Sequence, residues 1–463
     1  MEENFQYLED KNIKELGKFL DIKKSLNCDF TLCVKFSWHK YFETKYLIKD
    51  DTLYLKEKFK NYYLYSLPIG KNSDFKILID DFKKNNYPFF EFANLSLEEA
   101  IELKKKLPHS DYFYDRMWSD YLYETSNFVD FKGNKFSNKR RQLHKFLRTY
   151  PDVIFEEAKK EDYSKIKDFI KVFSLKKNQN DEEFLEEENE AIRIIDYIEE
   201  LNLKCFVIKD NLKIIGVTIL ELRNDIIFDH IEKCDKDYDG IYAFMINSIV
   251  NTFKDYHYMN REDDAGDEGL RFSKTELHPL KMIDKYEFKV NNNLDLLEDI
   301  YDIKVNDEIK LTKLKESMKL DYFNLYIDEE LNKYWGYDYK IDLKDNPLNE
   351  DYFFNMVNDD FNKKESFTFI INYKNEFAGE LVLYNLKNDN SAELGFRILK
   401  KFQQKGITFL AAKALINECF NEFKLKYLSI KSYKENIASI KFIKKIGAKF
   451  IEEDNEFYKF ILE

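Results

Sequence analysis

The chain has 463 residues, of which 44% are hydrophobic and 17% aromatic, and its formal net charge is −13. At roughly 150 residues per domain this length predicts about three domains, and the apolar content excludes an intrinsically disordered chain. The acidic balance disfavours a surface that binds nucleic acid or anionic membranes over most of its area.

Residues 1–150 predict elements in the order helix, strand, strand, helix, strand, helix. The pattern places a helix at 16–25, strands at 52–55 and 62–67, a helix at 75–86 and a strand at 89–92. Ser96 and Glu99 have the spacing of a capping box, which opens the last helix. This order predicts a mixed sheet flanked by helices.

A basic segment follows at 132–148. Its cationic side chains are Lys132, Lys135, Lys139, Arg140, Arg141, Lys145 and Arg148. They can form an anion-binding face for phosphate or RNA. A solvated helix on an acidic protein explains the same run, because charged runs usually face water. The sequence leaves both interpretations open.

The middle region predicts a strand at 153–155, helices at 163–173 and 181–201, and strands at 205–208, 213–222 and 226–231. Asp210 and Asn211 are suitable residues for a hairpin turn. A turn that ends at Gly240 then leads into an amphipathic helix at 240–253. The chain returns in a strand at 256–259, which is followed by Asn260.

The C-terminal region repeats this layout. A strand at 392–399 passes through a basic turn with Gly406 into a helix at 409–423, and a second strand begins at 427. The start of such a helix has free amides and the positive end of the helix dipole, and both favour a phosphate group. The turn therefore predicts an anion site, and the repeat predicts two copies of one fold.

The turn and the segment after the second strand resemble the GNAT acetyltransferase superfamily. The similarity lies in the Q/R-x-x-G-x-G/A pattern of Gln403, Gln404, Lys405, Gly406, Ile407 and Thr408, and in Asn436 and Ser439 followed by Gly447. Thr408 stands where the family prefers Gly or Ala. The resemblance covers about 150 residues and implies that these positions bind acetyl-CoA, with the turn amides on its pyrophosphate.

The resemblance also implies that a thioester lies where two central strands part. Glu380 and Glu393 lie on strands near that point, and either could accept a proton from an amine. An exposed acid on a strand explains each of them slightly better. Ile443 stands where many active members carry a tyrosine proton donor, so Tyr433 is the nearest replacement.

A second resemblance, over about 290 residues, is to the C-terminal catalytic family of phosphatidylglycerol lysyltransferases and its soluble relatives. The similar positions are Trp38, Pro68 to Gly70, Phe131 to Lys135, Arg140, Arg141, Lys145, Phe146, His230 to Lys233, Asn260 to Gly266, Gly269 to Arg271, Lys274, His278 and Pro279. This resemblance implies two tandem GNAT-like halves, and the membrane-bound members use aminoacyl-tRNA to modify a lipid.

The same motifs supply candidates for a second site. These are His230, Asn260, Arg261, Glu262, Asp264, Arg271 and Lys274. Their acids could serve as a base toward an amine, and their arginines could hold a carboxylate or phosphate in bidentate fashion. An internal ion-pair network explains them equally well, and His230 fits a hydrogen-bonded histidine at the edge of the core better than a general base.

Cysteines and apolar runs predict the compartment. Five cysteines, odd in number and scattered, have no partners at zinc spacing, so we expect reduced thiols and no metal site. The acidic start has no apolar core of a signal peptide. Apolar runs stay short of the roughly 20 residues of a membrane helix. We therefore expect a cytoplasmic protein.

Together these patterns predict an α+β protein of tandem GNAT-like folds, with mixed, mostly antiparallel sheets flanked by helices. We expect a degenerate GNAT-like half at 1–150, a second half at 151–295 and a GNAT domain at 306–463. The leading hypothesis is transfer of acetyl from acetyl-CoA to a primary amine of a small molecule or peptide. The alternatives are an aminoacyl-tRNA-dependent transferase, which the net charge disfavours, and a non-catalytic scaffold.

Overall fold

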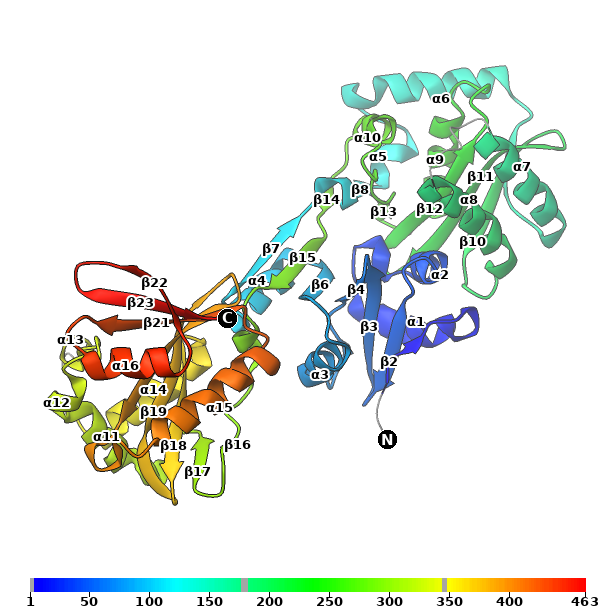
Figure 1. Ribbon diagram of the computed structural model, residues 1–463. Helices are drawn as coiled ribbons and strands as arrows, with labels where there is room; N and C mark the ends of the chain where they lie inside the picture. The colour runs from blue at the N-terminus through cyan, green and yellow to red at the C-terminus, as the bar shows by residue number, and fades with distance from the viewer. Residues whose placement is uncertain (1–3, 176–181, 344–347) are drawn as a thin grey trace. The chain divides into compact units, whose positions relative to one another are not determined.

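The computed structural model describes residues 4–175, 182–343 and 348–463. By the density of contacts the chain divides into two compact units, 1–98 with 112–287 and 99–111 with 288–463. Figure 1 traces the chain from the N-terminus in blue to the C-terminus in red. Helix α4 (Leu97–Lys106) and strands β7 (Ser110–Tyr114) and β15 (Tyr286–Val290) each contain a division point.

The first unit opens with a sheet in which β1, β2, β3, β4 and β6 are neighbours in that order. The strands in this order are β1 (Gln6–Tyr7), β2 (Lys45–Lys49), β3 (Thr52–Phe59), β4 (Tyr62–Tyr65) and β6 (Phe90–Leu95), and β5 (Ile69–Gly70) also pairs with β3. The helices are α1 (Ile13–Lys23), α2 (Leu32–Trp38) and α3 (Phe75–Asn85). Strands β4 and β6 pair in parallel, as a crossover through α3 requires.

A second sheet of the same unit has the order β14-β8-β13-β12-β11-β10-β9. Its strands are β8 (Asp120–Glu124), β9 (Ile154–Glu157), β10 (Lys204–Asp210), β11 (Lys213–Arg223), β12 (Ile226–Cys234), β13 (Tyr258–Asn260) and β14 (Lys281–Ile283). Its helices are α5 (Ser126–Val129), α6 (Ser137–Thr149), α7 (Tyr163–Leu175), α8 (Glu182–Ile194), α9 (Ile241–Thr252) and α10 (Glu268–Thr275). Residue 181, the expected first residue of the acidic helix, lies outside the described residues.

Apolar side chains cover both faces of this second sheet. Helix α7 packs on one face, and the apolar cluster there continues through α8 and α2 to α1, which packs on β3 and β5 of the first sheet. Helices α5, α6 and α9 pack on the other face. Strand β8 lies in the second sheet and helix α6 packs on that sheet, although both precede residue 150. The three-part division of the chain thus stays a proposal.

The second unit contains a sheet with the order β16-β17-β18-β19-β20-β21-β23-β22. The strands are β16 (Ile303–Lys304), β17 (Ile309–Thr312), β18 (Ser366–Tyr373), β19 (Glu376–Lys387), β20 (Ser391–Ile398), β21 (Tyr427–Tyr433), β22 (Lys449–Glu453) and β23 (Phe457–Leu462). The helices are α11 (Lys319–Ile327), α12 (Glu329–Asn332), α13 (Tyr339–Leu343), α14 (Glu350–Lys363), α15 (Ile407–Asn421) and α16 (Ile437–Lys445).

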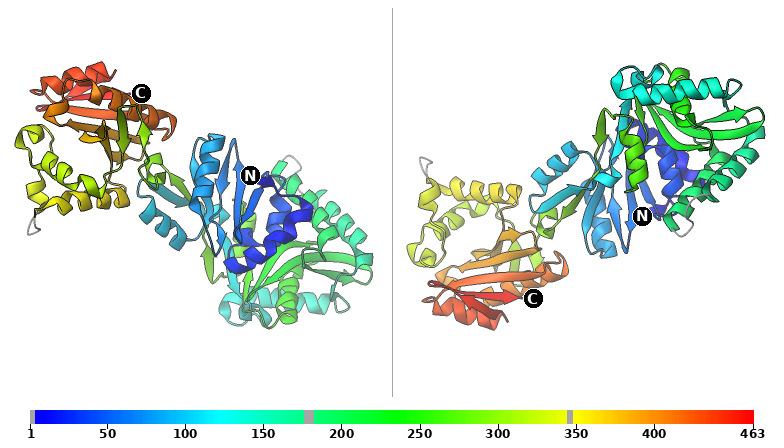
Figure 2. Two further views of the ribbon diagram at one scale, coloured as in Figure 1. Left: turned by 90° about the horizontal axis from the view of Figure 1, so that it is seen from below. Right: turned by 90° about the horizontal axis from the view of Figure 1, so that it is seen from above.

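Figure 2 shows how these helices cover the sheet, with the yellow α11 to α14 on one side and the orange and red α15 and α16 on the other. One apolar cluster includes Ala411, Leu415 and Ile443 beneath α15 and α16. A smaller cluster around Tyr322 and Phe353 lies beneath α11 and α14. The expected fold class, mixed and mostly antiparallel sheets flanked by helices, is confirmed.

Among the residues that the structure describes, no helix combines the length and the apolar character that a bilayer crossing needs. The five cysteines all lie within the described ranges, where they are buried free thiols.

Candidate functional sites

The central strands of the second unit part from each other. Strands β20 and β21 pair in parallel only at Ser391–Tyr427, Ala392–Leu428 and Glu393–Ser429. Beyond that point β20 stays paired with β19 as far as Ile398, and β21 stays paired with β23 as far as Tyr433. Within the described residues no further pair joins the two strands, so the sheet opens into a V whose backbone amides and carbonyls can bind an extended ligand.

Gly406 lies at one end of this opening, where it is the N-cap of α15. Its φ is 78°, which favours glycine because a Cβ disfavours this region. A Cβ placed on Gly406 would meet no atom of the described residues within 4 Å. The space beside Gly406 at the start of α15, called the corner below, is therefore open. Because α15 continues for 15 residues, its first amides and dipole present a positive terminus at this corner.

The other turn residues surround that terminus. The side-chain amide of Gln403 donates to the Ile398 carbonyl at 3.4 Å, Gln404 also has positive φ, and Lys405 lies over the Phe402 ring. Ile407 is buried and Thr408 is half-buried in the first turn of the helix. The structure therefore brings the predicted turn residues together around α15.

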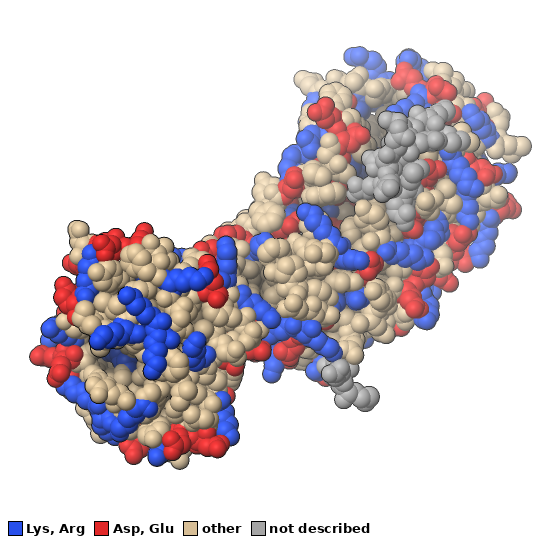
Figure 3. Space-filling model, in the orientation of Figure 1, with Lys and Arg blue, Asp and Glu red and all other residues tan. Residues whose placement is uncertain are grey.

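Asn436 begins the neighbouring helix α16. Its side-chain oxygen accepts a hydrogen bond from the Ser439 amide at 3.1 Å, so Asn436 is a helix cap. Ile443 is fully buried in the core. Three lysines, Lys441, Lys444 and Lys445, lie on α16, and Figure 3 shows Lys and Arg side chains gathered over this face of the C-terminal unit.

Glu380 is part of a buried ion pair. Its carboxylate accepts from Arg397 Nε at 2.6 Å and from the Tyr322 hydroxyl at 2.7 Å, and it is fully buried. The Arg397 guanidinium lies 4.0 Å from the ring centroids of both Tyr326 and Trp335. Burial opposes its charge, but Glu380 and the two tyrosines raise the Arg397 pKa further. The hydrogen bonds from Arg397 and Tyr322 therefore occupy the Glu380 carboxylate inside the core.

Glu393 has a different environment at the point where the strands part. Its carboxylate accepts from the Tyr384 hydroxyl at 2.7 Å and from Asn385 Nδ2 at 3.2 Å. Lys431 Nζ lies 3.2 Å from Glu393 Oε2. Burial and the Glu393 charge hold the pKa of Tyr384 well above its usual range.

Tyr433 ends β21, two residues beyond Lys431 on the same face of the strand. Its ring centroid lies 4.3 Å from that of Phe457 and 5.7 Å from that of Tyr334. On β20, the Trp335 ring lies against Gly395, because a Cβ on Gly395 would lie 3.0 Å from that ring. Sequence reasoning missed Lys431 and Tyr384, although the two-residue alternation along β21 places Lys431 beside Tyr433.

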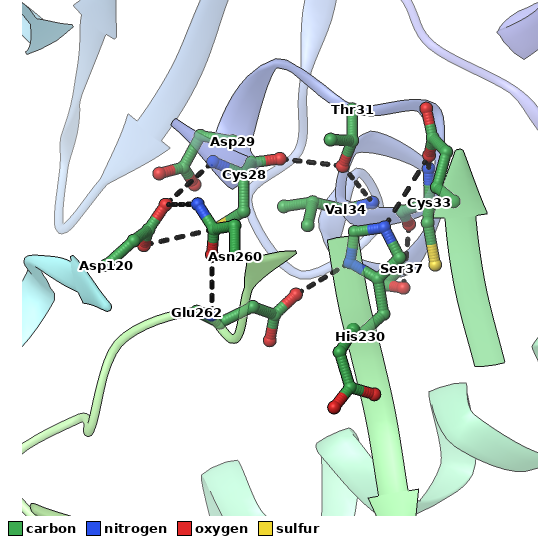
Figure 4. A network of polar contacts seen from close by, with 12 residues as sticks. Cys28, Asp29, Thr31, Cys33, Val34, Ser37, Asp120, His230, Asn260 and Glu262 are labelled. Atoms are coloured by element: carbon green, nitrogen blue, oxygen red, sulfur yellow. Dashed lines mark hydrogen bonds and ion pairs between the residues drawn. The ribbon is translucent and has the colours of Figure 1, made fainter. Parts of the chain in front are cut away.

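The second-site candidates of the first unit lie in several groups of hydrogen bonds and ion pairs, and Figure 4 shows the group around His230 and Asn260. His230 Nδ1 lies 2.7 Å from Glu262 Oε1, and its Nε2 lies 3.6 Å from Glu221 Oε2. Glu221 also accepts from the amides of Leu32 and Cys33, at 3.2 and 2.9 Å. Burial lowers the His230 pKa, but the two carboxylates outweigh that effect and raise it to about 9. His230 is thus protonated at neutral pH.

Asn260 connects this group to Asp120. Its Nδ2 donates to Asp120 Oδ2 at 2.9 Å, and its Oδ1 accepts from the Glu262 amide at 2.7 Å. Asp120 also accepts from the Cys28 amide at 2.8 Å and lies 2.7 Å from Lys285 Nζ. Asn260 is fully buried, so its amide holds the loop after β13 to the sheet.

Arg261 pairs with two buried acids of β12. Its Nε lies 3.2 Å from Asp229 Oδ2, and its Nη2 lies 2.5 Å from Glu232 Oε2. Glu232 Oε1 has no hydrogen-bond partner among the described residues. Burial raises the Glu232 pKa to about 8, and the Asp229 charge adds to that effect while Arg261 opposes it.

Asp264 and Arg271 form a further ion pair, and Lys274 contacts the neighbouring Asp263. Arg271 contacts Asp264 in bidentate fashion at 3.0 and 2.8 Å, and Arg116 and the Tyr121 hydroxyl also bond to this acid. Burial would raise the Asp264 pKa, but these donors hold it well below its usual range. Lys274 donates to the Asp263 carbonyl, and burial and Arg261 lower its pKa.

The first unit has the same parting of two parallel strands, but the space beside its N-cap glycine is filled. Strands β12 and β13 pair in parallel only from Ile226–Tyr258 to Phe228–Asn260. Gly240, with φ 89°, is the N-cap of α9. A Cβ on Gly240 would lie 2.5 Å from the Gln142 carbonyl oxygen of α6. Helix α6 therefore fills the position that stays open at Gly406.

The outer face of α6 carries the basic segment. A groove of about 700 Å³ is lined there by side chains that include Lys132, Arg140, His144 and Asn247. Some cations are already paired, since Lys145 lies 2.6 Å from Asp239 and Lys139 lies 3.1 Å from Glu276. Arg141 and Arg148 are exposed beside the groove.

Comparisons with known proteins agree with this division. Residues 24–288 match the family model described as phosphatidylglycerol lysyltransferase, C-terminal, and residues 309–449 match the acetyltransferase (GNAT) domain. A crystal structure of a conserved protein of unknown function from Bacteroides thetaiotaomicron is 27% identical, with a TM-score of 0.57. The match covers 62% of this chain and 99% of that chain.

An uncharacterized protein of Mycoplasmoides gallisepticum is 25% identical over 175 residues, which are 37% of this chain and 56% of that protein. The match thus spans about half the length of this curated relative. The first family model covers more than half of the present chain. The chain therefore belongs to the phosphatidylglycerol lysyltransferase C-terminal family, and it carries a GNAT acetyltransferase domain at residues 309–449.

Proposed function

We propose that the second unit transfers an acetyl group from acetyl-CoA to a primary amine of a small molecule or peptide. The observation that carries this proposal is the parting of β20 and β21 after Glu393 and Ser429, beside an open corner at Gly406. An extended thioester fits between strands whose backbone groups are free, and a pyrophosphate fits a helix N-terminus.

The residues of the corner suit the co-substrate. Amides from Gln403 to Thr408 would hold the pyrophosphate, and Lys405 with the α16 lysines would add positive charge. Asn436 and Ser439 would take part by positioning α16 beside it. When bound, acetyl-CoA supplies the acyl group as an activated thioester.

In this proposal Glu393 accepts a proton from the acceptor amine, directly or through one water. It is buried at the end of the paired region and faces the same side of the sheet as Tyr433. Tyr433 then donates a proton to the leaving sulfur. Glu380 supports the site through Arg397, because its carboxylate is already engaged by two donors.

Titration calorimetry with acetyl-CoA tests the proposal. We expect the wild-type protein to bind and Gly406→Glu to abolish binding, because the new carboxylate would occupy the corner and repel phosphate. Gly133→Glu is the matched control, since Gly133 also has positive φ and open surroundings but lies in the first unit. Absence of heat with the wild-type protein would refute the proposal.

A second candidate is an aminoacyl-tRNA-dependent transfer by the first unit. The groove on α6 favours it, because exposed cations lie around a polar hollow in an otherwise acidic chain. We expect charged tRNA to shift in a gel at low salt, and Arg141→Glu with Arg148→Glu to weaken that shift. The same change at the exposed Lys11 and Lys160 is the control. Absence of any complex at low salt would exclude this candidate.

A cytoplasmic location belongs to the same proposal, since the cysteines are free thiols.

A further inference from the structure

Lys431 occupies an unusual position on β21. It lies two residues beyond Ser429, the last residue that pairs with β20, and so it lies where the two strands part. Its side chain extends to the face that carries Glu393, and Nζ lies 3.2 Å from Glu393 Oε2. The Lys431 side chain is 41% exposed, so its amine contacts both the solvent and the Glu393 carboxylate.

The carboxylate does not need this lysine for its hydrogen bonds. Tyr384 donates to one oxygen of Glu393 and Asn385 donates to the other. Glu393 itself is only 2% exposed. A primary amine thus contacts the buried acid that the proposed reaction uses as its base, at the position that an acceptor amine must reach.

Two other lysines of this sheet contact acids other than Glu393. Lys459 is the cross-strand partner of Lys431 on β23, and its Nζ lies 2.9 Å from Glu452. Lys449 lies 3.4 Å from Glu463 and is 75% exposed. These two lysines offer the same functional group without the neighbouring base at the parted strands.

We propose that Lys431 is itself an acceptor, so that the protein acetylates its own Lys431 from acetyl-CoA. This inference rests on the proposed function of the second unit. The Lys431 nitrogen forms a bond to the thioester carbonyl carbon, and the carbon–sulfur bond breaks. Glu393 takes one proton from the Lys431 ammonium, and the second proton that the nitrogen loses passes to the sulfur, which leaves as the free thiol of CoA. The products are Nε-acetyllysine and CoA.

The short distance between Nζ and the carboxylate favours this step, because an amine held beside its base reacts without the entropy cost of bringing the two together. Acetylation removes the positive charge of Lys431 and with it the ion pair to Glu393. The modified side chain would then lie beside the opening in which an external amine must bind. The modification therefore acts at the acceptor site and not at the α15 corner.

Mass spectrometry of the full-length protein tests the inference. Purified protein is incubated with deuterium-labelled acetyl-CoA, and the labelled fraction at Lys431 is followed over time beside those at Lys449 and Lys459. We expect Lys431 to be labelled at least about tenfold faster than the more exposed Lys449, since positioned general-base catalysis contributes about 10²–10⁴-fold. Uncatalysed acetylation would follow exposure and give the opposite order.

Two variants sharpen the experiment. Glu393→Gln keeps the size of the side chain but removes the base, and it should reduce labelling of Lys431 to the rate of Lys449. Lys431→Arg keeps the charge beside Glu393 and should remove the fast phase altogether. Binding of CoA by calorimetry shows that each variant remains folded at the corner.

Acetylation of spermidine and of a lysine-containing hexapeptide is measured in parallel. If an external amine is acetylated while Lys431 is labelled no faster than Lys449, the inference is wrong and the proposed function stands. An equal rate in Glu393→Gln and the wild type also overturns the inference. If CoA does not bind and no amine is acetylated, the proposed function itself fails.

Discussion

Glu393 and Ser429 are the last residues at which β20 and β21 pair. In the first unit, Phe228 and Asn260 are the last residues at which β12 and β13 pair. The same opening therefore occurs in both units, but only the corner at Gly406 is open. The two units differ in the space beside the N-cap glycine, which α6 fills at Gly240 and which is open at Gly406.

Glu393→Gln should lower kcat for acetyl transfer by about 10²–10⁴-fold while leaving CoA affinity nearly unchanged. The amide cannot take the proton, but the corner around α15 is untouched. Glu452→Gln, which removes an acid of the exposed β22 hairpin, is the control. Steady-state kinetics with spermidine and calorimetry with CoA give the two numbers. A similar kcat in Glu393→Gln and wild type would exclude Glu393 as the base.

Arg397→Met should destabilise the second unit by about 3–5 kcal/mol, because it leaves the Glu380 charge buried without its partner. Glu380→Leu in the same chain should restore part of that loss, since the isolated charge is removed. Urea unfolding followed by Trp335 fluorescence, with Trp38 and Trp118 changed to Phe, reports on this unit. A loss below about 1 kcal/mol would contradict a buried ion pair.

The two N-cap glycines should respond differently to alanine. Gly406→Ala should cost about 1–2 kcal/mol, which is the strain of a left-handed backbone with a Cβ. Gly240→Ala should cost more, because its Cβ would also lie 2.5 Å from the Gln142 carbonyl oxygen. Chemical denaturation of both variants measures the difference. Equal costs would show that α6 does not close the corner at Gly240.

Calorimetry should give one molecule of acetyl-CoA per chain, although the chain contains two parted-strand openings. The corner at Gly240 has no room for a pyrophosphate beside the Gln142 carbonyl, whereas the corner at Gly406 is open. Gly406→Glu should therefore remove all binding and not half of it. A stoichiometry of two would show that α6 moves away from α9.

Glu232→Gln should stabilise the first unit at pH 9 and have little effect near pH 5. The folded state holds the Glu232 proton up to about pH 8, whereas the ordinary pKa is 4.5. The stability from the protonated acid is therefore complete below pH 4.5 and is lost as the pH rises through 8. Glutamine keeps the neutral form, which should give about 1–3 kcal/mol at pH 9. The test is urea unfolding at both pH values.

His230→Gln should destabilise the first unit at pH 6 and lose that effect above pH 9. Here the folded pKa, about 9, lies above the ordinary value of 6.5. The stability from the protonated ring is complete below 6.5 and disappears as the pH rises through 9. The cost at pH 6 should be about 2–3 kcal/mol. An NMR titration of the His230 ring checks the pKa directly, and a value near 6.5 would contradict the two-carboxylate contact.

Local patterns in the sequence determined the elements and the two families. Gly406 and Gly240 mark helix starts because only glycine accepts their backbone angles without strain, and the alternation along the strands fixes which side chains share a face. The motif around Asn260 indicates the first family from local sequence alone. It also left the roles of its charged residues open.

Only the tertiary structure decided which charges meet. Glu380 and Glu393 have similar sequence surroundings, yet Glu380 forms an ion pair with Arg397 and Glu393 forms one with Lys431. Local spacing cannot predict these contacts, because they depend on which strands become neighbours and on where those strands part. The closure of the Gly240 corner likewise depends on α6, which lies about a hundred residues earlier in the chain.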